Sequence, residues 1–311
     1  MEFFKKKTNF PFMGTRKLWY TASAIMIVVS IGSFVTRGLN LAVDFTGGVT
    51  AEVHFAAQPN LDRVRAELAK QGFEDPQAQT FGSSRDVLVR LPPQTKTTSA
   101  EVRSRVERAV KAVSGDAEIK RVEVVGPQVG AELRNSSIWS LIATVILIFI
   151  YVALRFHTLR LGLGAILAAL HDPILVVGFF SVTQMPFDLA VVAAVLAVIG
   201  YSLNDTVVVF DRIRERFEAN RRSPPSDVLD ESVNSTLSRT VMTAVTTLIV
   251  VVVLYLLGGA ALQGFSAAII VGIVVGTYSS IYIAAAIALD LGLKAEHLFP
   301  ARDRKAIDDM P

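Results

Sequence analysis

Long apolar segments alternate with short polar ones along most of the chain. A helix needs about 17–25 mostly apolar residues to cross the hydrocarbon core of a bilayer. We expect six segments to do so: residues 18–35, 138–154, 161–182, 189–210, 238–257 and 265–289. The pattern therefore predicts a polytopic α-helical membrane protein with six transmembrane helices, polar ends at 1–17 and 290–311, and a polar loop at 211–237.

One polar stretch, residues 36–137, is long enough to fold as a domain. Four short segments have the alternation or β-branched content typical of strands: 49–55, 78–82, 86–91 and 118–126. Residues 60–73 and 98–113 have the 3.6-residue period of amphipathic helices, with Asn60 and Ser99 as expected N-caps. The order β-α-β-β-α-β predicts a ferredoxin-like α+β domain between the first two spans.

Lys and Arg residues lie on alternate sides of the predicted spans. They precede the first span, separate the second from the third and the fourth from the fifth, and follow the sixth, whereas residues 183–188 and 258–264 contain none. By the positive-inside rule, both termini are expected to be cytoplasmic and 36–137 to lie outside. The basic start, with Lys5, Lys6 and Lys7, resembles a signal peptide. The long apolar run without a small-residue cleavage site favours an uncleaved anchor.

Composition narrows the possible classes. Hydrophobic residues make up 51% of the 311 residues, and the chain contains no Cys. A disulfide framework and a thiolate metal site are therefore excluded. The net charge of +3 is modest. The basic residues lie beside apolar spans, so we interpret them as topology signals and expect no nucleic-acid partner. We also expect no metal and no cofactor.

Charged residues inside the spans are the main candidates for function, because each is costly in a bilayer. Asp205 follows Asn204 about 16 residues into the fourth span, and Arg239 opens the fifth. The two spans are antiparallel, so the charges lie at similar depth and are expected to pair. Such a pair either fixes helix packing or breaks and reforms as the carboxylate binds and releases a proton.

Other polar residues have two open interpretations. Asp172 lies in the third span between His171 and Pro173; it belongs either to a polar relay or to groups that satisfy the backbone freed by the proline. Asp211 and Arg212 have the pattern of a solvated helix end, although Arg212 shares the face of Asp205.

A polar stripe on one face of the fifth span should avoid lipid; it comprises Ser232, Thr236, Arg239, Thr243 and Thr246. Gly272 and Gly276 form a small-xxx-small pair that permits close helix packing.

Three motifs resemble the SecF branch of the SecD/SecF family, in the resistance–nodulation–division superfamily. They are "LAVDFTGGV" (41–49), "GYSLNDTVVVFDRIRE" (200–215) and "NSTLSRTVMTAVTTL" (234–248). The resemblance implies a proton-driven accessory complex of the Sec translocon in the bacterial inner membrane, promoting late steps of protein export. It also implies a separate SecD chain, the channel SecYEG, YajC and YidC, and unfolded exported polypeptides as partners.

The resemblance assigns roles to particular residues. Asp205 corresponds to the intramembrane carboxylate of the family and Arg239 to its basic partner, with Asn204 adjacent; Asp172 matches a further family aspartate. The motif with Asp44, Gly47 and Gly48 is expected to form a hinge or base for the external domain, rather than a substrate contact.

Two other classes compete with this interpretation. An intramembrane aspartyl protease needs two carboxylates that share a proton. Asp205 lacks the Gly-x-Gly-Asp signature, and neither HExxH nor a Gly-x-Ser-x-Gly elbow is present, so no enzyme is expected. The alternative is a passive assembly subunit whose charges only pack helices.

Overall fold

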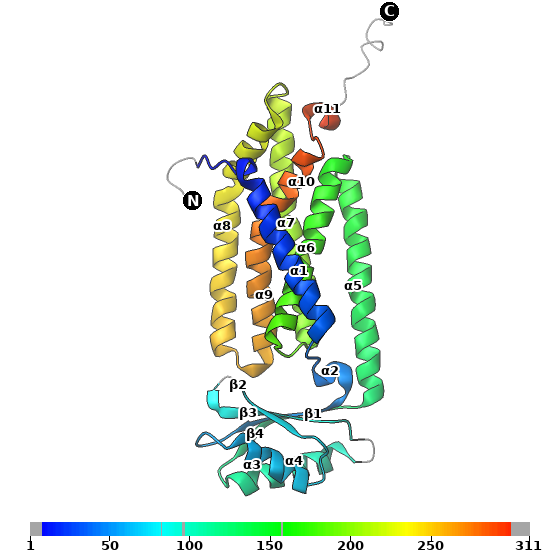
Figure 1. Cartoon of the computed structure of the whole chain (residues 1–311), viewed down its shortest axis with the longest axis vertical. Coiled ribbons are helices and arrows are strands. Elements are labelled where there is room, and N and C mark those ends of the chain that lie inside the picture. Colours follow the sequence, from blue (N-terminus) through cyan, green and yellow to red (C-terminus); the bar gives the residue numbers. More distant parts are fainter. Residues whose placement is uncertain (1–7, 82, 95–96, 157, 300–311) are drawn as a thin grey trace, which may run out of the picture.

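The computed structural model describes residues 8–81, 83–94, 97–156 and 158–299. A bundle of long helices stands on a small α+β domain at one end, and the bundle and domain are linked through α1 and α5 (Figure 1). Within the described residues, six helices are long and apolar enough to cross a membrane, as predicted. Lys5, Lys6 and Lys7 lie outside the described residues.

The spanning helices extend beyond the apolar segments. Their bounds are α1 (Arg16–Arg37), α5 (Pro127–Arg155), α6 (Leu159–Thr183), α7 (Leu189–Ala219), α8 (Pro225–Leu257) and α9 (Ala260–Ser279), the last continued by the π-turn η2 (Ser280–Ala284) and by α10 (Ala285–Asp290). Short helices η1 (Met13–Thr15), α2 (Val43–Thr46) and α11 (Ala295–Leu298) flank them. Most of the expected loop 211–237 is therefore helical. The prediction followed apolar residues only, and a helix that continues into water is built from polar ones.

The external domain has the predicted ferredoxin-like order. It comprises β1 (Gly48–His54), α3 (Leu61–Lys70), β2 (Gln77–Phe81), β3 (Ser83–Leu91), α4 (Ser99–Val113) and β4 (Glu118–Val125). The strands form an antiparallel sheet in the order β2-β3-β1-β4. Helices α3 and α4 cover one face, and the other face is turned toward the bundle (Figure 1). Val49, Ala51 and Val53 point into the helix-covered core, which fixes the strand register.

Only one of the two expected helix caps is correct. The Asn60 side chain accepts hydrogen bonds from the backbone N–H groups of Asp62 and Arg63. The Ser99 cap is wrong by one residue: Thr98 is the N-cap, and its hydroxyl accepts from the N–H of Glu101. Both residues are good caps, so sequence alone does not separate neighbours of this kind.

Burial divides the bundle into an inner and an outer set of helices. The most apolar windows of α6, α7 and the span at Ala261–Asp290 are each 56% buried, compared with 11% for α1, 6% for α5 and 17% for α8. The inner three helices therefore form the core of the bundle. Asp172 and Asp205, two of the candidate residues, lie on α6 and α7.

Candidate functional site

Asp172 is fully buried at the centre of the bundle. One carboxylate oxygen accepts hydrogen bonds from the hydroxyls of Ser202 on α7 and Ser279 on α9, the latter at 2.9 Å. The other oxygen lies 2.8 Å from Nδ1 of His171. Gly276 makes room for this cluster, because a Cβ there would lie 3.0 Å from the Cβ of Ser202.

The network continues from Asp172 to the edge of the bundle. Nε2 of His171 lies 3.1 Å from the hydroxyl of Ser23 on α1. Ser23 in turn lies 2.5 Å from the hydroxyl of Tyr278, which donates to the backbone oxygen of Trp19. These links join side chains from four helices, and none of them satisfies a backbone group beside Pro173. The geometry therefore matches the expected polar relay better than the alternative of local backbone repair.

Sequence reasoning missed the serines and the tyrosine in this network. Neutral polar residues occur commonly in spans and cost little in a bilayer, so the search for costly residues did not select Ser202, Ser279, Ser23 or Tyr278. The available signal was indirect: Ser202 lies three residues before Asp205, and Ser279 lies three residues after Gly276.

Asp205 is also buried, with 4% of its surface exposed, but its surroundings differ. Its Oδ2 atom is buried and has no hydrogen-bond partner among the residues that the structure describes. The next residue, Thr206, meets Ser280 of the π-turn at 3.1 Å between hydroxyls. A buried carboxylate oxygen without a donor is costly unless the acid is neutral or water reaches it. Burying Asp205 in its ionised form is therefore costly, and no contact in the described residues offsets that cost at Oδ2.

The expected ion pair between Asp205 and Arg239 is absent. No nitrogen–oxygen distance of 4.0 Å or less joins the two residues, although the charge of Arg239 still acts electrostatically on the carboxylate. Arg239 is exposed on the surface of α8, and Asn204 is exposed on α7. Similar depth does not determine helix rotation, so the two charges can lie at one level without touching, and Arg239 is exposed instead.

The polar stripe on α8 is divided between two environments. Ser232 and Thr236 are buried, whereas Thr246 is exposed together with Arg239. The hydroxyls of Thr236, Thr243 and Thr246 donate to carbonyls one turn earlier on the same helix. The threonines therefore need no partner of their own, and Arg239 is the residue that leaves a charge exposed on this face.

Charged residues at the inner end of α7 bind neighbouring elements. Asp211 forms an ion pair with Arg155 at the end of α5. Arg212 donates to Glu215 at 2.7 Å and to Ser235 on α8 at 3.0 Å. The side chains of Asp211 and Arg212 are both more than a third exposed, and both also contact neighbouring elements, so solvation of this helix end stays a prediction.

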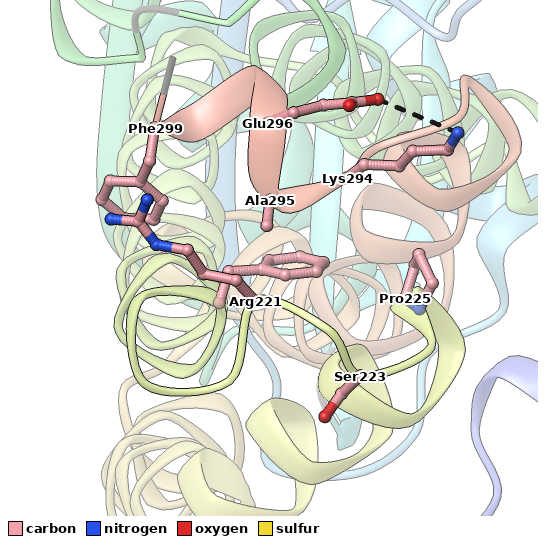
Figure 2. Close-up of a pocket in the computed structure, with 8 residues that line it drawn as sticks. Arg221, Ser223, Pro225, Lys294, Ala295, Glu296 and Phe299 are labelled. Carbon is pink, nitrogen blue, oxygen red and sulfur yellow. Dashed lines mark ion pairs between the residues drawn. The ribbon is translucent and has the colours of Figure 1, made fainter. Parts of the chain in front are cut away.

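A hollow of 370 Å³ lies at the same end of the bundle, between the α7–α8 connection and α11. Figure 2 shows Arg221 beside the ring of Phe299, with Lys294 and Glu296 joined at 3.8 Å across the rim. The guanidinium carbon of Arg221 lies 5.0 Å from the ring centroid, a cation–π contact between the α7–α8 connection and the residue that follows α11. The buried acidic residues do not line this hollow.

The motif with Asp44, Gly47 and Gly48 lies where the external domain meets the bundle. Gly47 and Gly48 have φ angles of 70° and 129°, which side chains rarely adopt. A Cβ on Gly47 would lie 2.9 Å from Cα of Pro127 in α5, and one on Gly48 would lie 2.5 Å from the carbonyl oxygen of Leu91. Asp44 accepts a hydrogen bond from the backbone N–H of Leu189, the first residue of α7. The motif therefore joins the base of the domain to two spanning helices.

Six apolar helices with buried carboxylates, attached to a ferredoxin-like domain, define a multi-pass membrane protein with a domain outside the bundle. Family models agree with this class: "Protein export membrane protein SecD/SecF, C-terminal" matches residues 105–294, and "SecD/SecF GG Motif" matches residues 32–58. The chain belongs to the SecD/SecF family.

Its curated relatives include "Protein translocase subunit SecF" of Haemophilus influenzae, 44% identical over 98% of this chain and 94% of the relative. The protein of the same name from Vibrio alginolyticus is 44% identical over 99% of this chain and 98% of the relative. These likenesses show that the chain is a multi-pass protein of the bacterial inner membrane with a role in protein export.

Solved structures of SecDF show the same fold. The crystal structure of SecDF, a translocon-associated membrane protein from Thermus thermophilus, matches with a TM-score of 0.82 at 36% identity over 94% of this chain. A crystal structure of SecDF in a super-membrane-facing form matches with a TM-score of 0.67 at the same identity and coverage. This chain spans 39% of each of those longer chains.

Proposed function

We propose that this chain uses the proton motive force to promote late steps of protein export, as the SecF subunit of a SecD–SecF complex. The observation that carries the proposal is Asp205, a buried carboxylate in a core helix with an oxygen that has no hydrogen-bond partner. Binding a proton removes the cost of that burial, so the charge state of Asp205 is coupled to the packing around α7. We assign the chain a role in energy coupling rather than catalysis.

The driving force is adequate for such a switch. One elementary charge crossing 100 mV is worth about 2.3 kcal/mol, which shifts a two-state equilibrium roughly fiftyfold. The proton enters from the side of the external domain if both termini are cytoplasmic, as the distribution of Lys and Arg indicates. Asp172 then provides a second acidic centre, linked to α7 through the hydroxyl of Ser202.

SecD is the partner that this surface requires. Arg239 and Asn204 are exposed on the bundle, and the orientation proposed from the basic residues places them in the inner half of the membrane, where a charge facing lipid costs several kcal/mol. A polar or acidic face of SecD would cover them and complete the environment of Asp205. Through SecD, we propose, the complex meets SecYEG, with YajC and YidC, and an unfolded exported polypeptide.

A change of shape is supported by the solved relatives. Two SecDF structures have equal identity and coverage against this chain but TM-scores of 0.82 and 0.67, so they differ in arrangement over the matched part. Export would be driven if protonation of Asp205 moved the external domain between two such arrangements.

The test is export into inner-membrane vesicles with and without a proton gradient. Asp205→Asn keeps the size of the side chain and removes its ionisation. Asp290→Asn is the matched control, because Asp290 lies at the exposed end of α10. We expect Asp205→Asn to lose the gradient-stimulated part of late translocation at equal levels of assembled complex, and the control to retain it. Unchanged stimulation in Asp205→Asn would instead indicate a passive assembly subunit.

A further inference from the structure

The external domain holds α7 through a hydrogen bond that α7 does not need for its own folding. Oδ2 of Asp44 accepts from the N–H of Leu189 at 3.0 Å. The helix already has an N-cap of its own, because Oδ1 of Asp188 accepts from the N–H of Val191 at 2.8 Å. Helix N-termini favour carboxylates. Because Asp188 already caps α7, the carboxylate of Asp44 serves mainly to link the segment before β1 to α7.

Other contacts hold the same junction in register. The N–H of Ala42 donates to the carbonyl of Phe187 at 2.9 Å, and the N–H of Phe187 donates to the carbonyl of Asn40 at 2.8 Å. The Asn40 side chain donates to the carbonyl of Gln184 and accepts from Arg90 on β3, at 2.8 and 2.9 Å. These bonds join the segment before the domain, the sheet itself and the α6–α7 loop.

The sheet does not rest flat on the bundle beside this junction. A cavity of 430 Å³, lined in part by Asp44, Arg90 and Asp188, lies between the sheet and the outer ends of the helices. Phe45 is the apolar anchor: it is buried, and its ring centroid lies 6.2 Å from that of Phe187. Apart from the direct chain connection of β4 to α5, contact between bundle and sheet is therefore concentrated around α2.

Both sides of the contact are stiff. From Leu189 to Asp205, α7 is continuous helix over 16 residues, about 24 Å at 1.5 Å per residue. On the domain side, Asp44 is separated from the start of β1 by only three residues, ending in the tightly enclosed Gly47. A displacement of α7 at Asp205 reaches Asp44 without an intervening flexible loop.

We propose that Asp44 is a positioning residue that transmits the movement of α7 to the external domain through its hydrogen bond with the N–H of Leu189. The inference rests on the proposed function, since it assumes that Asp205 drives the movement. The inference gives Asp44 a role separate from that of Gly47 and Gly48, whose lack of a side chain lets neighbouring backbone atoms come close.

The chain has no Cys, so a pair of spin labels can be introduced without background. Arg103→Cys on the exposed face of α4 and Leu257→Cys at the outer end of α8 report the distance from domain to bundle. Pulsed electron paramagnetic resonance on the complex with a cysteine-free SecD, in vesicles, measures that distance with Asp205 intact and with Asp205→Asn.

We expect Asp205→Asn to shift the distance distribution when Asp44 is present, and the shift to disappear with Asp44→Ala. Asp44→Asn should restore it, because the amide oxygen still accepts from Leu189. Asp188→Ala removes the cap that α7 supplies itself and the charge of Asp188 beside Arg90, but it keeps the hydrogen bond between Asp44 and Leu189, so it should leave the shift intact.

A shift that persists in Asp44→Ala overturns the inference but leaves the proposed function standing. If Asp44→Ala does not assemble, Asp44→Asn decides: loss of the shift there, with the hydrogen-bond acceptor retained, also overturns the inference. Lost export stimulation in Asp205→Asn without any shift overturns the transmission role alone. Unchanged stimulation and no shift overturn both.

Discussion

Gly48→Ala tests whether the base of the external domain needs glycine for reasons of space and backbone conformation. Gly48 is buried at the start of β1, with a φ of 129°. An added Cβ would lie 2.5 Å from the carbonyl oxygen of Leu91, a backbone atom of the neighbouring strand that cannot rotate away. The variant therefore combines backbone strain with a steric clash.

The magnitude follows from these two costs. A non-glycine residue in this region of φ costs about 1–3 kcal/mol. Forcing a methyl group into a closely packed site costs about 1–3 kcal/mol more. We expect a loss of about 2–6 kcal/mol in local stability, which corresponds to at least about thirtyfold faster opening at 1.4 kcal/mol per factor of ten.

Amide hydrogen exchange of the full chain with its partner measures this loss. Exchange should accelerate along β1 and the paired end of β3, while the core of α6 and α7 keeps its protection. Gly115→Ala is the matched control: Gly115 lies in the same domain, has no positive φ, and a Cβ added there would meet no atom within 4 Å. Equal exchange of β1 in the two variants would refute the reasoning.

Two further substitutions probe the bundle and the domain. Gly272→Ala should lower the thermal stability of the purified chain, because a Cβ would overlap a methyl of Val198; Gly200→Ala, with open space around it, should be neutral or stabilising by up to about 1 kcal/mol. Burial raises the pKa of Asp86, but three hydrogen bonds outweigh it and hold that pKa well below its usual range. The donors are Ser83, Lys120 and His54. Asp86→Asn should therefore destabilise the domain by about 1 kcal/mol at pH 7. The difference in unfolding free energy should begin to shrink near about pH 4, where the carboxylate of the unfolded chain becomes protonated, and should close only as the pH falls through the lower pKa of the folded protein. A difference that does not change with pH would contradict the ionic origin of this contribution.

The amphipathic periods and apolar lengths were sufficient to predict the six helices and the order of the external domain, because both depend on residues close together in the sequence. The small-xxx-small pair Gly272 and Gly276 was predictable as a packing face. Its partners, Val198 and Ser202, became visible only in the structure, where they lie one turn apart on α7. Sequence period defines the face of a helix but does not identify the neighbour that it meets.

The same limit explains the two outcomes for the buried charges. Energetic cost alone identified Asp172 and Asp205 as unusual, and both are buried. Cost could not show that Asp172 has hydroxyl donors from two other helices, nor that Arg239 is exposed and forms no ion pair with Asp205. Helix rotation depends on the sum of many packing contacts, so a pairing inferred from depth alone had no rotational information.

The sparse packing of α5 has a consequence for the lipid environment. This helix leads from the external domain back into the membrane, yet only 6% of its most apolar window is buried. The other connection, α1, packs closely against α6: a Cβ on Gly178 of α6 would clash with Ser30 of α1. With 29 residues, α5 is about 44 Å long, but only residues 138–154 are apolar, about 26 Å of helix against roughly 30 Å of hydrocarbon. The polar first part of α5 therefore projects beyond the membrane toward the domain. With so few helix contacts, the fit of the apolar part to the bilayer sets the tilt of the whole helix. Bilayer thickness therefore sets the inclination of one of the two supports of the external domain, and membranes of different acyl-chain length should hold that domain at different angles.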